Sequence, residues 1–84
     1  MASLYILQSL RSGKFYIGSS TDVARRLSEH QRQQSLSTRH RGPWNLVYQE
    51  QFASLTEARR RERQIKSWKS HRAIEQLISG EGSG

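Results

Sequence analysis

Two short aromatic tripeptides near the start of the chain constrain its fold more than any other feature. They are Leu-Tyr-Ile at 4–6 and Tyr-Ile-Gly at 16–18. Each lies in an apolar run typical of a β-strand, and the intervening residues 9–13 contain a glycine and have the right length for a hairpin loop. We therefore expect an antiparallel hairpin in which Tyr5 and Tyr16 are close cross-strand neighbours.

The remaining residues predict one further strand and three helices. Ser54, followed three residues later by Glu57, forms a capping box that opens a helix, and Ser67 or Ser70 caps a short last helix. The resulting order, ββαβαα, has too few crossovers for a doubly wound sheet. It predicts an α+β fold in which helices flank a small three-stranded antiparallel sheet. Strands are expected at 3–8, 14–18 and 44–51, and the two longer helices at about 22–32 and 55–67.

Length and composition limit the kind of protein. The chain has 84 residues, which favours a single domain over residues 1–79 followed by a Gly/Ser-rich tail at 80–84 that is expected to be disordered. It has no cysteine, which excludes disulfides and thiolate zinc sites. No apolar run approaches the roughly 18 residues needed to span a membrane, and the first residues lead into a strand rather than a signal peptide. We therefore expect a soluble, cytoplasmic protein.

The net charge of +7, with 14 basic residues of which 11 are arginine, points to nucleic acid as the first partner to consider. The guanidinium fork suits phosphate, although a solvated basic surface without a specific partner remains an alternative. Residues 33–43 are expected to form an exposed basic loop, and Arg59, Arg60 and Arg63 to form a basic face. The residues expected to contact a DNA backbone are Lys14, Arg25, Arg39, Arg41, Arg59 and Arg63.

Three ionisable side chains fall on helix faces that should be apolar. Arg26 and His30 share a stripe at helical spacing with the apolar residues of the first helix, and Glu62 does the same on the second helix with Ala58 and Ile65. Such groups are costly to desolvate unless they pair with one another or bind a ligand. Spacing alone leaves two interpretations open: an internal Glu62–Arg26 salt bridge with His30 as a hydrogen-bonding partner, or a functional site.

The tyrosines have the same ambiguity, because a strand tyrosine is usually a core aromatic with a hydrated hydroxyl. Tyr5 and Tyr16, each considered singly, favour a structural role over a catalytic one. Tyr48, in the predicted third strand, is interpreted in the same way.

Taken together, these elements resemble the GIY-YIG endonuclease family, in its small single-domain branch. The resemblance rests on the two tripeptides, the Arg26-x-x-x-His30 pair, the third strand at 44–50 and the acidic helix at 57–66, and it covers residues 3–79. Leu4 stands where the family name has glycine. The asparagine that some larger members place after the acidic helix has no clear counterpart.

The resemblance implies one metal-dependent phosphodiesterase site. Glu62 is expected to bind a single Mg²⁺ or Mn²⁺, and Arg26 to contact the scissile phosphate. Tyr5, assisted by Tyr16 and His30, is expected to orient or deprotonate the attacking water. Because the pKa of tyrosine is ordinarily about 10, we expect the metal, Arg26 and Lys14 to favour the Tyr5 phenolate.

The function predicted from the resemblance is hydrolysis of DNA phosphodiester bonds. The alternatives are a catalytically silent nucleic-acid-binding module of the same fold, and a small structural or protein-interaction domain. No recognition helix or zinc module is appended, so selectivity is expected to come from nicked, flapped or branched DNA or from a protein partner. DNA repair is one of several pathways that use this family, and the sequence leaves the acceptance of RNA and the oligomeric state open.

Overall fold

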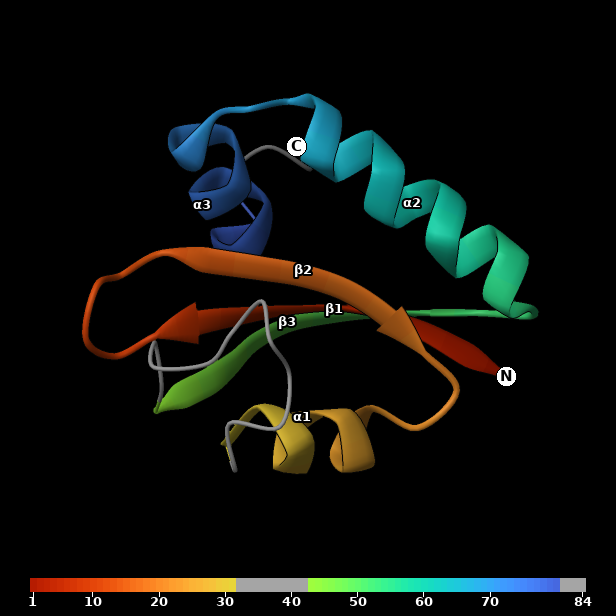
Figure 1. The fold of residues 1–84 in the computed structure, drawn as a ribbon. Coiled ribbons are helices and arrows are strands. Elements are labelled where there is room, and N and C mark those ends of the chain that lie inside the picture. The colour runs from red at the N-terminus through yellow and green to blue at the C-terminus, as the bar shows by residue number, and fades with distance from the viewer. Residues whose placement is uncertain (32–42, 81–84) are drawn as a thin grey trace.

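A computed structural model describes residues 1–31 and 43–80, and it confirms the predicted order ββαβαα (Figure 1). The sheet has the strand order β2-β1-β3, and both pairings are antiparallel. Apart from Pro43, the predicted basic loop with Arg39 and Arg41 lies outside the described residues, as does the chain after residue 80. The elements are β1 (Ala2–Ser9), β2 (Phe15–Ser20), α1 (Val23–Gln31), β3 (Trp44–Phe52), α2 (Leu55–Ser67) and α3 (His71–Ser79).

The predicted hairpin joins β1 to β2. Gly13 takes a φ of +76° in its turn, a conformation that a glycine adopts without a steric penalty. The hydroxyl of Ser9 accepts hydrogen bonds from the backbone N–H groups of the turn. The register pairs Tyr5 with Gly18 and places Tyr16 diagonally opposite Tyr5, with 6.4 Å between the two ring centroids. The expectation that the two tyrosines are close neighbours is therefore confirmed.

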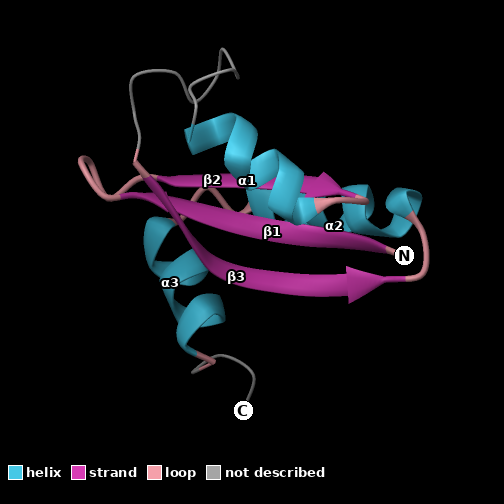
Figure 2. Cartoon of the chain, turned by 90° about the horizontal axis from the view of Figure 1, so that it is seen from below, coloured by secondary structure: helices cyan, strands magenta, loops and turns pink. Residues whose placement is uncertain are grey.

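The sheet is covered on both faces, which explains why the central strand β1 is buried along most of its length. Figures 1 and 2 show α1 on one face and both α2 and α3 on the other. On the α2/α3 face the core contains Leu4, Ile6 and Ile65. On the α1 face it contains Tyr5 and Leu7, together with Trp44 of β3. None of the helices among the described residues is long and apolar enough to cross a lipid bilayer.

Side-chain caps define where the helices begin. The carboxylate of Asp22 accepts the N–H of Arg25 at 3.0 Å before α1. Ser54 caps α2, as predicted, and Ser70 rather than Ser67 caps α3. The three helices therefore start within a residue or two of the positions that the sequence predicts.

Two polar links hold the helices in register with β3. The side-chain amide of Gln31, the last residue of α1, bonds both the backbone N–H and the carbonyl of Trp44. On the other face Arg61 of α2 forms a salt bridge of 3.1 Å with Glu50, which also accepts the hydroxyl of Tyr48. Tyr48 thus has the structural role that its sequence context predicts.

The Tyr5 ring packs closely against the backbone of Gly18. A Cβ placed on Gly18 would lie 2.5 Å from Oη and 2.6 Å from Cζ of Tyr5, far inside van der Waals contact. Tyr5 is only 1% exposed. The phenol therefore lies over the β2 backbone, and only a glycine on the neighbouring strand leaves room for it.

We expect Gly18→Ala to destabilise the protein by about 1–3 kcal/mol, because the added methyl overlaps the phenol. Urea denaturation of Gly18→Ala, Tyr5→Leu and the double variant would measure this. The cost of Gly18→Ala should fall sharply in the Tyr5→Leu background, since leucine has no atoms at the positions of Cζ and Oη. Additive free energies in the two backgrounds would contradict a direct clash.

Candidate active site

The first part of the candidate site lies on the α1 face and is built around the Tyr5 hydroxyl. Oη of Tyr5 lies 3.3 Å from Nε2 of His30, and the Arg26 side chain lies near enough to this hydroxyl to lower the pKa of the phenol. Tyr16 packs on the imidazole, with 4.6 Å between the ring centroids. The structure therefore brings together four of the five predicted catalytic residues, because β1, β2 and α1 each contribute to one cluster.

Burial within this cluster raises the pKa of Tyr5 above its ordinary value of 10.0. Desolvation is the largest cause, and the nearby Arg26 guanidinium opposes it without cancelling it. Lys14 has no part in this balance, since it lies in a hollow with Lys66 and Lys69 beside the start of α3. Arg26 thus favours the phenolate, as expected, but burial outweighs it, so that Tyr5 is a neutral phenol in the protein by itself; the expected contribution of Lys14 is wrong.

The imidazole of His30 is fully buried, and burial lowers its pKa below the ordinary 6.5. The positive charge of Arg26 lowers it further, while Glu29 acts in the opposite direction. His30 is therefore neutral near pH 7. In the tautomer that carries its hydrogen on Nδ1, the neutral imidazole accepts the phenol proton at Nε2.

The second part of the site, Glu62, belongs to α2 on the other face of the sheet. Its Oε1 accepts a hydrogen bond of 2.6 Å from the Ser19 hydroxyl, and its Oε2 lies 2.6 Å from Nζ of Lys66. Arg26 instead pairs with Glu29 on its own helix, at 2.8 Å. The internal Glu62–Arg26 salt bridge, one of the two interpretations left open by the sequence, is therefore absent from residues 1–31 and 43–80.

The two parts meet at the open edge of β2. Tyr5 crosses the backbone at Gly18, and the next residue, Ser19, turns to the other face and holds Glu62. The negative charge of Glu62 is one of the minor causes that raise the pKa of Tyr5. Tyr5 and Gly18 are buried at this boundary, whereas the charged groups on either side of it reach solvent. The side chains of Arg26 and Glu62 are 40% and 21% exposed.

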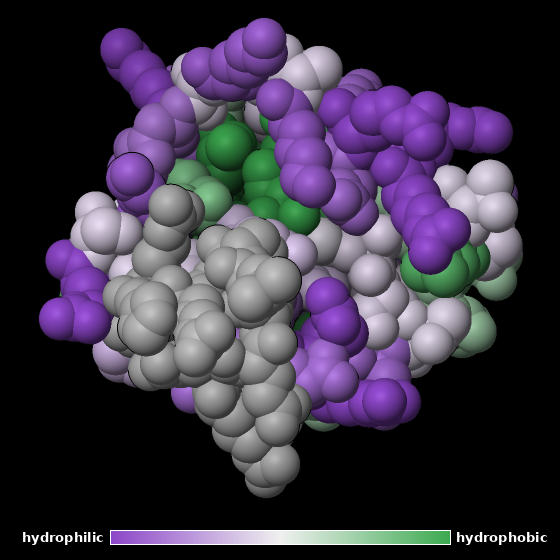
Figure 3. All heavy atoms as spheres, viewed as in Figure 1, coloured by the Kyte–Doolittle hydropathy of each residue, from purple (hydrophilic) through white to green (hydrophobic). Residues whose placement is uncertain are grey.

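A shallow hollow of about 310 Å³ opens beside Glu62, with Arg59, Arg63 and Lys66 as its other lining residues. Hydrophilic side chains crowd this side of α2 in Figure 3. Arg60 does not share this hollow, since it lines another one with Arg61 on the opposite flank of α2. The expectation of one face with Arg59, Arg60 and Arg63 is therefore corrected to Arg59 and Arg63.

The other predicted DNA contacts are more scattered. Arg25 is exposed on α1 and lies 3.5 Å from Glu29, and Lys14 lies beyond the hairpin turn in the hollow near α3. Arg39 and Arg41 fall outside the described residues.

The donor set near Glu62 fits only a cation that takes few protein ligands. Within residues 1–31 and 43–80, no three His, Asp or Glu side chains cluster as a metal site. Mg²⁺ matches this setting, because it keeps several waters and commonly uses one or two carboxylates together with substrate phosphate. The contact between Lys66 and Oε2 would have to open before that oxygen could bind a cation.

Three residues of the site are missed by sequence reasoning. Ser19 and Lys66 contact the Glu62 carboxylate, and Gly18, which has no Cβ, leaves room for the Tyr5 ring at the sheet edge. Lys66 lies four residues after Glu62, a spacing that predicts an ion pair on one helix. Gly18 carries the signal of a glycine inside a strand, which indicates a close approach of another group. The hydrogen bond of Ser19 joins two distant segments and has no local signal.

The sequence of this chain is similar to those of known proteins. A model of the GIY-YIG catalytic domain family matches residues 1–75. UPF0213 protein BH0048 of Halalkalibacterium halodurans is 41% identical over 80 residues, covering 94% of this chain and 83% of that protein. UPF0213 protein SSP2268 of Staphylococcus saprophyticus is 32% identical over 78 residues, covering 92% and 94%.

A solved structure resembles the fold as well. The solution NMR structure of UPF0213 protein BH0048 from Bacillus halodurans superposes with a TM-score of 0.59 at 40% identity, covering 98% of this chain and 87% of that one. The family match spans both tyrosines, Arg26, His30 and Glu62. The chain thus belongs to the GIY-YIG family and carries its catalytic domain, the domain of a family of nucleases.

Proposed function

We propose that this protein is a divalent-metal-dependent endonuclease that hydrolyses DNA phosphodiester bonds. The observation that carries the proposal is the arrangement at the β2 edge. The Tyr5 phenol lies against a neutral imidazole and near a guanidinium, and it packs over Gly18, the residue before the serine that holds the Glu62 carboxylate. A structural domain has no need of such polar groups at an open edge. A phosphodiesterase uses all of them.

Arg26 is the residue proposed to bind the scissile phosphate. Its guanidinium is part-exposed and already lies at the Tyr5 hydroxyl. A guanidinium in that place offers further donors to two phosphate oxygens and stabilises the negative charge that develops on them. Glu29 keeps Arg26 oriented through its 2.8 Å ion pair.

Tyr5 and His30 are proposed to carry the proton away from the attacking water. The phenol oxygen accepts a proton from the water as the water attacks phosphorus, while the phenol proton moves to Nε2 of His30, 3.3 Å away. A neutral Tyr5 serves this relay without ever becoming a free phenolate, which suits its raised pKa. Tyr16 packs on the imidazole and keeps its plane fixed.

Glu62 is proposed to bind the cation, Mg²⁺ or Mn²⁺. When bound, such an ion polarises the phosphate and stabilises the leaving oxygen. Ser19 positions the carboxylate for this task through its 2.6 Å hydrogen bond. Because the chain supplies a single carboxylate, we expect cation binding to be weak until a phosphate adds its own oxygens.

The protein is further proposed to select DNA by its shape rather than by its base sequence. We propose that residues 1–79 act as one domain. Among the described residues, this domain offers Arg25, Arg59 and Arg63 as phosphate contacts. Phosphate contacts orient a protein on DNA but carry no sequence information. Nicked or branched DNA is therefore the proposed substrate. We propose that the protein acts in the cytoplasm, either alone or with a targeting protein, and DNA repair is one role that fits this activity.

We expect Glu62→Gln to abolish metal-dependent cutting, because an amide keeps the shape of the carboxylate but binds Mg²⁺ weakly. The assay is cleavage of labelled single-stranded, duplex, nicked and branched DNA with Mg²⁺, Mn²⁺ or EDTA. Loss of about 10²-fold or more is the expected result. Glu75→Gln is the matched control, since Glu75 is an exposed carboxylate on α3 that pairs with His71.

Binding of DNA without cutting by the unaltered protein, under every metal condition, would contradict the proposal and favour a catalytically silent binding module. Equal activity of Glu62→Gln and Glu75→Gln would contradict the role of Glu62 in binding the cation.

The pH dependence of folding stability tests whether His30 is neutral. Because burial lowers its pKa in the folded state, the unfolded chain, with a pKa of about 6.5, takes up the proton first as the pH falls. The stability due to neutral His30 is complete above pH 6.5 and is lost below it. Urea denaturation between pH 7.5 and 5 should show this loss in the unaltered protein and a smaller loss in His30→Gln. Parallel pH profiles of the two proteins would refute a lowered pKa.

A further inference from the structure

A second basic hollow, of about 320 Å³, lies where the hairpin meets the junction between α2 and α3. Three lysines from different parts of the chain line it, and its floor is apolar. In Figure 3 apolar surface is visible between hydrophilic side chains over the meeting of β2 and α3. The lysines are Lys14, Lys66 and Lys69, and the apolar residues are Phe15, Ile17 and Ile74.

The charge of this hollow is unbalanced. No carboxylate within residues 1–31 or 43–80 forms an ion pair with Lys14 or Lys69, and no acidic residue lines the hollow itself. Lys69 also has a φ of +50°, in a backbone region where glycine or asparagine is favoured over lysine. Lys66 pairs with Glu62, but Lys14 and Lys69 leave two uncompensated ammonium groups on the apolar floor, a setting for a polyanion that also carries apolar surface.

We infer that this hollow binds a single-stranded stretch of the nucleic acid whose phosphodiester is cut beside Glu62. The lysines contact its phosphates, and the apolar floor takes an unpaired base. The inference rests on the proposed nuclease function, because it places the hollow on the path of a strand that passes the active site.

Lys66 connects the hollow to the active site, since it lines both this hollow and the one that contains Glu62. Arg59, Arg63 and Lys66 recur at helical spacing along one flank of α2, and Lys69 follows at the end of the helix. From Arg59 to Lys66 the helix rises about 10 Å. The row therefore offers the phosphates of a strand three cations in succession between this hollow and Glu62.

The floor favours a single strand over a duplex. Phe15 stacks on the ring of His71 at a centroid distance of 4.5 Å and an angle of 25°. The His71 side chain is 55% exposed and pairs only loosely with Glu75, at 3.5 Å. An unpaired base can extend this stack, whereas the bases of a duplex already stack on one another. Sequence-tolerant binding of single strands uses this combination of basic groove and aromatic platform.

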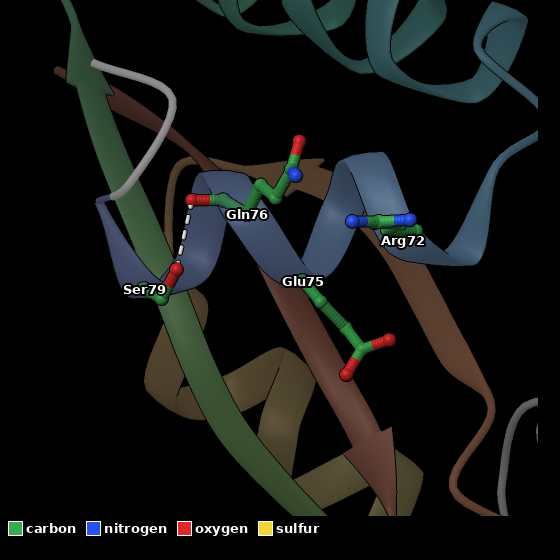
Figure 4. A pocket seen from close by; sticks show the side chains of 4 residues that line it. All are labelled: Arg72, Glu75, Gln76 and Ser79. Atoms are coloured by element: carbon green, nitrogen blue, oxygen red, sulfur yellow. Dashed lines mark hydrogen bonds between the residues drawn. The ribbon is translucent and has the colours of Figure 1, made fainter. Parts of the chain in front are cut away.

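The hollow on α3 provides a contrast, because it lacks these features. It lies on the outer side of α3 and is lined by Arg72, Glu75, Gln76 and Ser79, all from one helix (Figure 4). The Ser79 hydroxyl donates to the Gln76 carbonyl within the helix. One cation and one carboxylate give this hollow no net charge. Arg72→Gln therefore removes a positive charge nearby without touching the proposed strand path.

The test measures binding in EDTA, so that it does not depend on cutting. Fluorescence anisotropy would follow a labelled oligothymidine, an abasic strand of equal length and a duplex at several salt concentrations. For single strands each lost phosphate contact lowers the slope of log K against log salt by about 0.7. The Lys14→Gln/Lys69→Gln variant should lose about 1.4 of slope and bind oligothymidine about 25-fold more weakly at about 0.1 M salt. Arg72→Gln, compared with the unaltered protein, is the control.

The double variant should lose much less affinity for the duplex than for oligothymidine, and the unaltered protein should bind the abasic strand about tenfold more weakly. Equal losses in the double variant and Arg72→Gln would overturn the inference, as would equal losses for single strand and duplex. Equal binding of the abasic strand would overturn the base contact. If the unaltered protein cuts DNA but the lysine substitutions leave its binding of oligothymidine unchanged, this inference is refuted and the proposed nuclease function stands. If the lysines contribute to binding of oligothymidine but the unaltered protein cuts no DNA, the proposed nuclease function is refuted and this inference about binding stands.

Discussion

The contact between the phenol of Tyr5 and the bare backbone of Gly18 is the constraint on which the candidate site depends. A buried tyrosine on a central strand would ordinarily end in the core. Here the neighbouring strand has no Cβ at the paired position, so the ring crosses β2 and carries its hydroxyl to the sheet edge. There it lies 3.3 Å from Nε2 of His30 and near the guanidinium of Arg26, both on α1. The hairpin register thus decides which residues the phenol meets.

The same register sets the second half of the site. Successive residues of a strand face opposite sides of the sheet, so that Gly18 lies under Tyr5 while Ser19 faces α2. Ser19 holds Glu62, and Lys66 holds its other oxygen. A site divided between two faces has to lie at an edge strand, because a central strand would separate its halves by a layer of backbone. The placement of β2 at the edge gives a phosphate access to both.

Burial has opposite effects on the two kinds of group in this site. It raises the pKa of Tyr5 and lowers that of His30, so that both are neutral and share one proton between phenol and imidazole. The side chains of Arg26 and Glu62 are part-exposed and lie near solvent. This division is consistent with a proton relay inside the core and phosphate or cation contacts at its rim.

The sequence by itself determined the elements, their order and the hairpin, because strand alternation, helix periodicity and serine caps are local signals. It also placed Arg26, His30 and Glu62 on inward helix faces, since the period of a helix defines its faces. Only the tertiary structure decided their partners. Arg26 pairs with Glu29 rather than Glu62, Lys14 lies away from Tyr5, and Tyr5 gains a raised rather than a lowered pKa. The reason is that pairing and desolvation depend on how distant segments pack, and no local spacing records that.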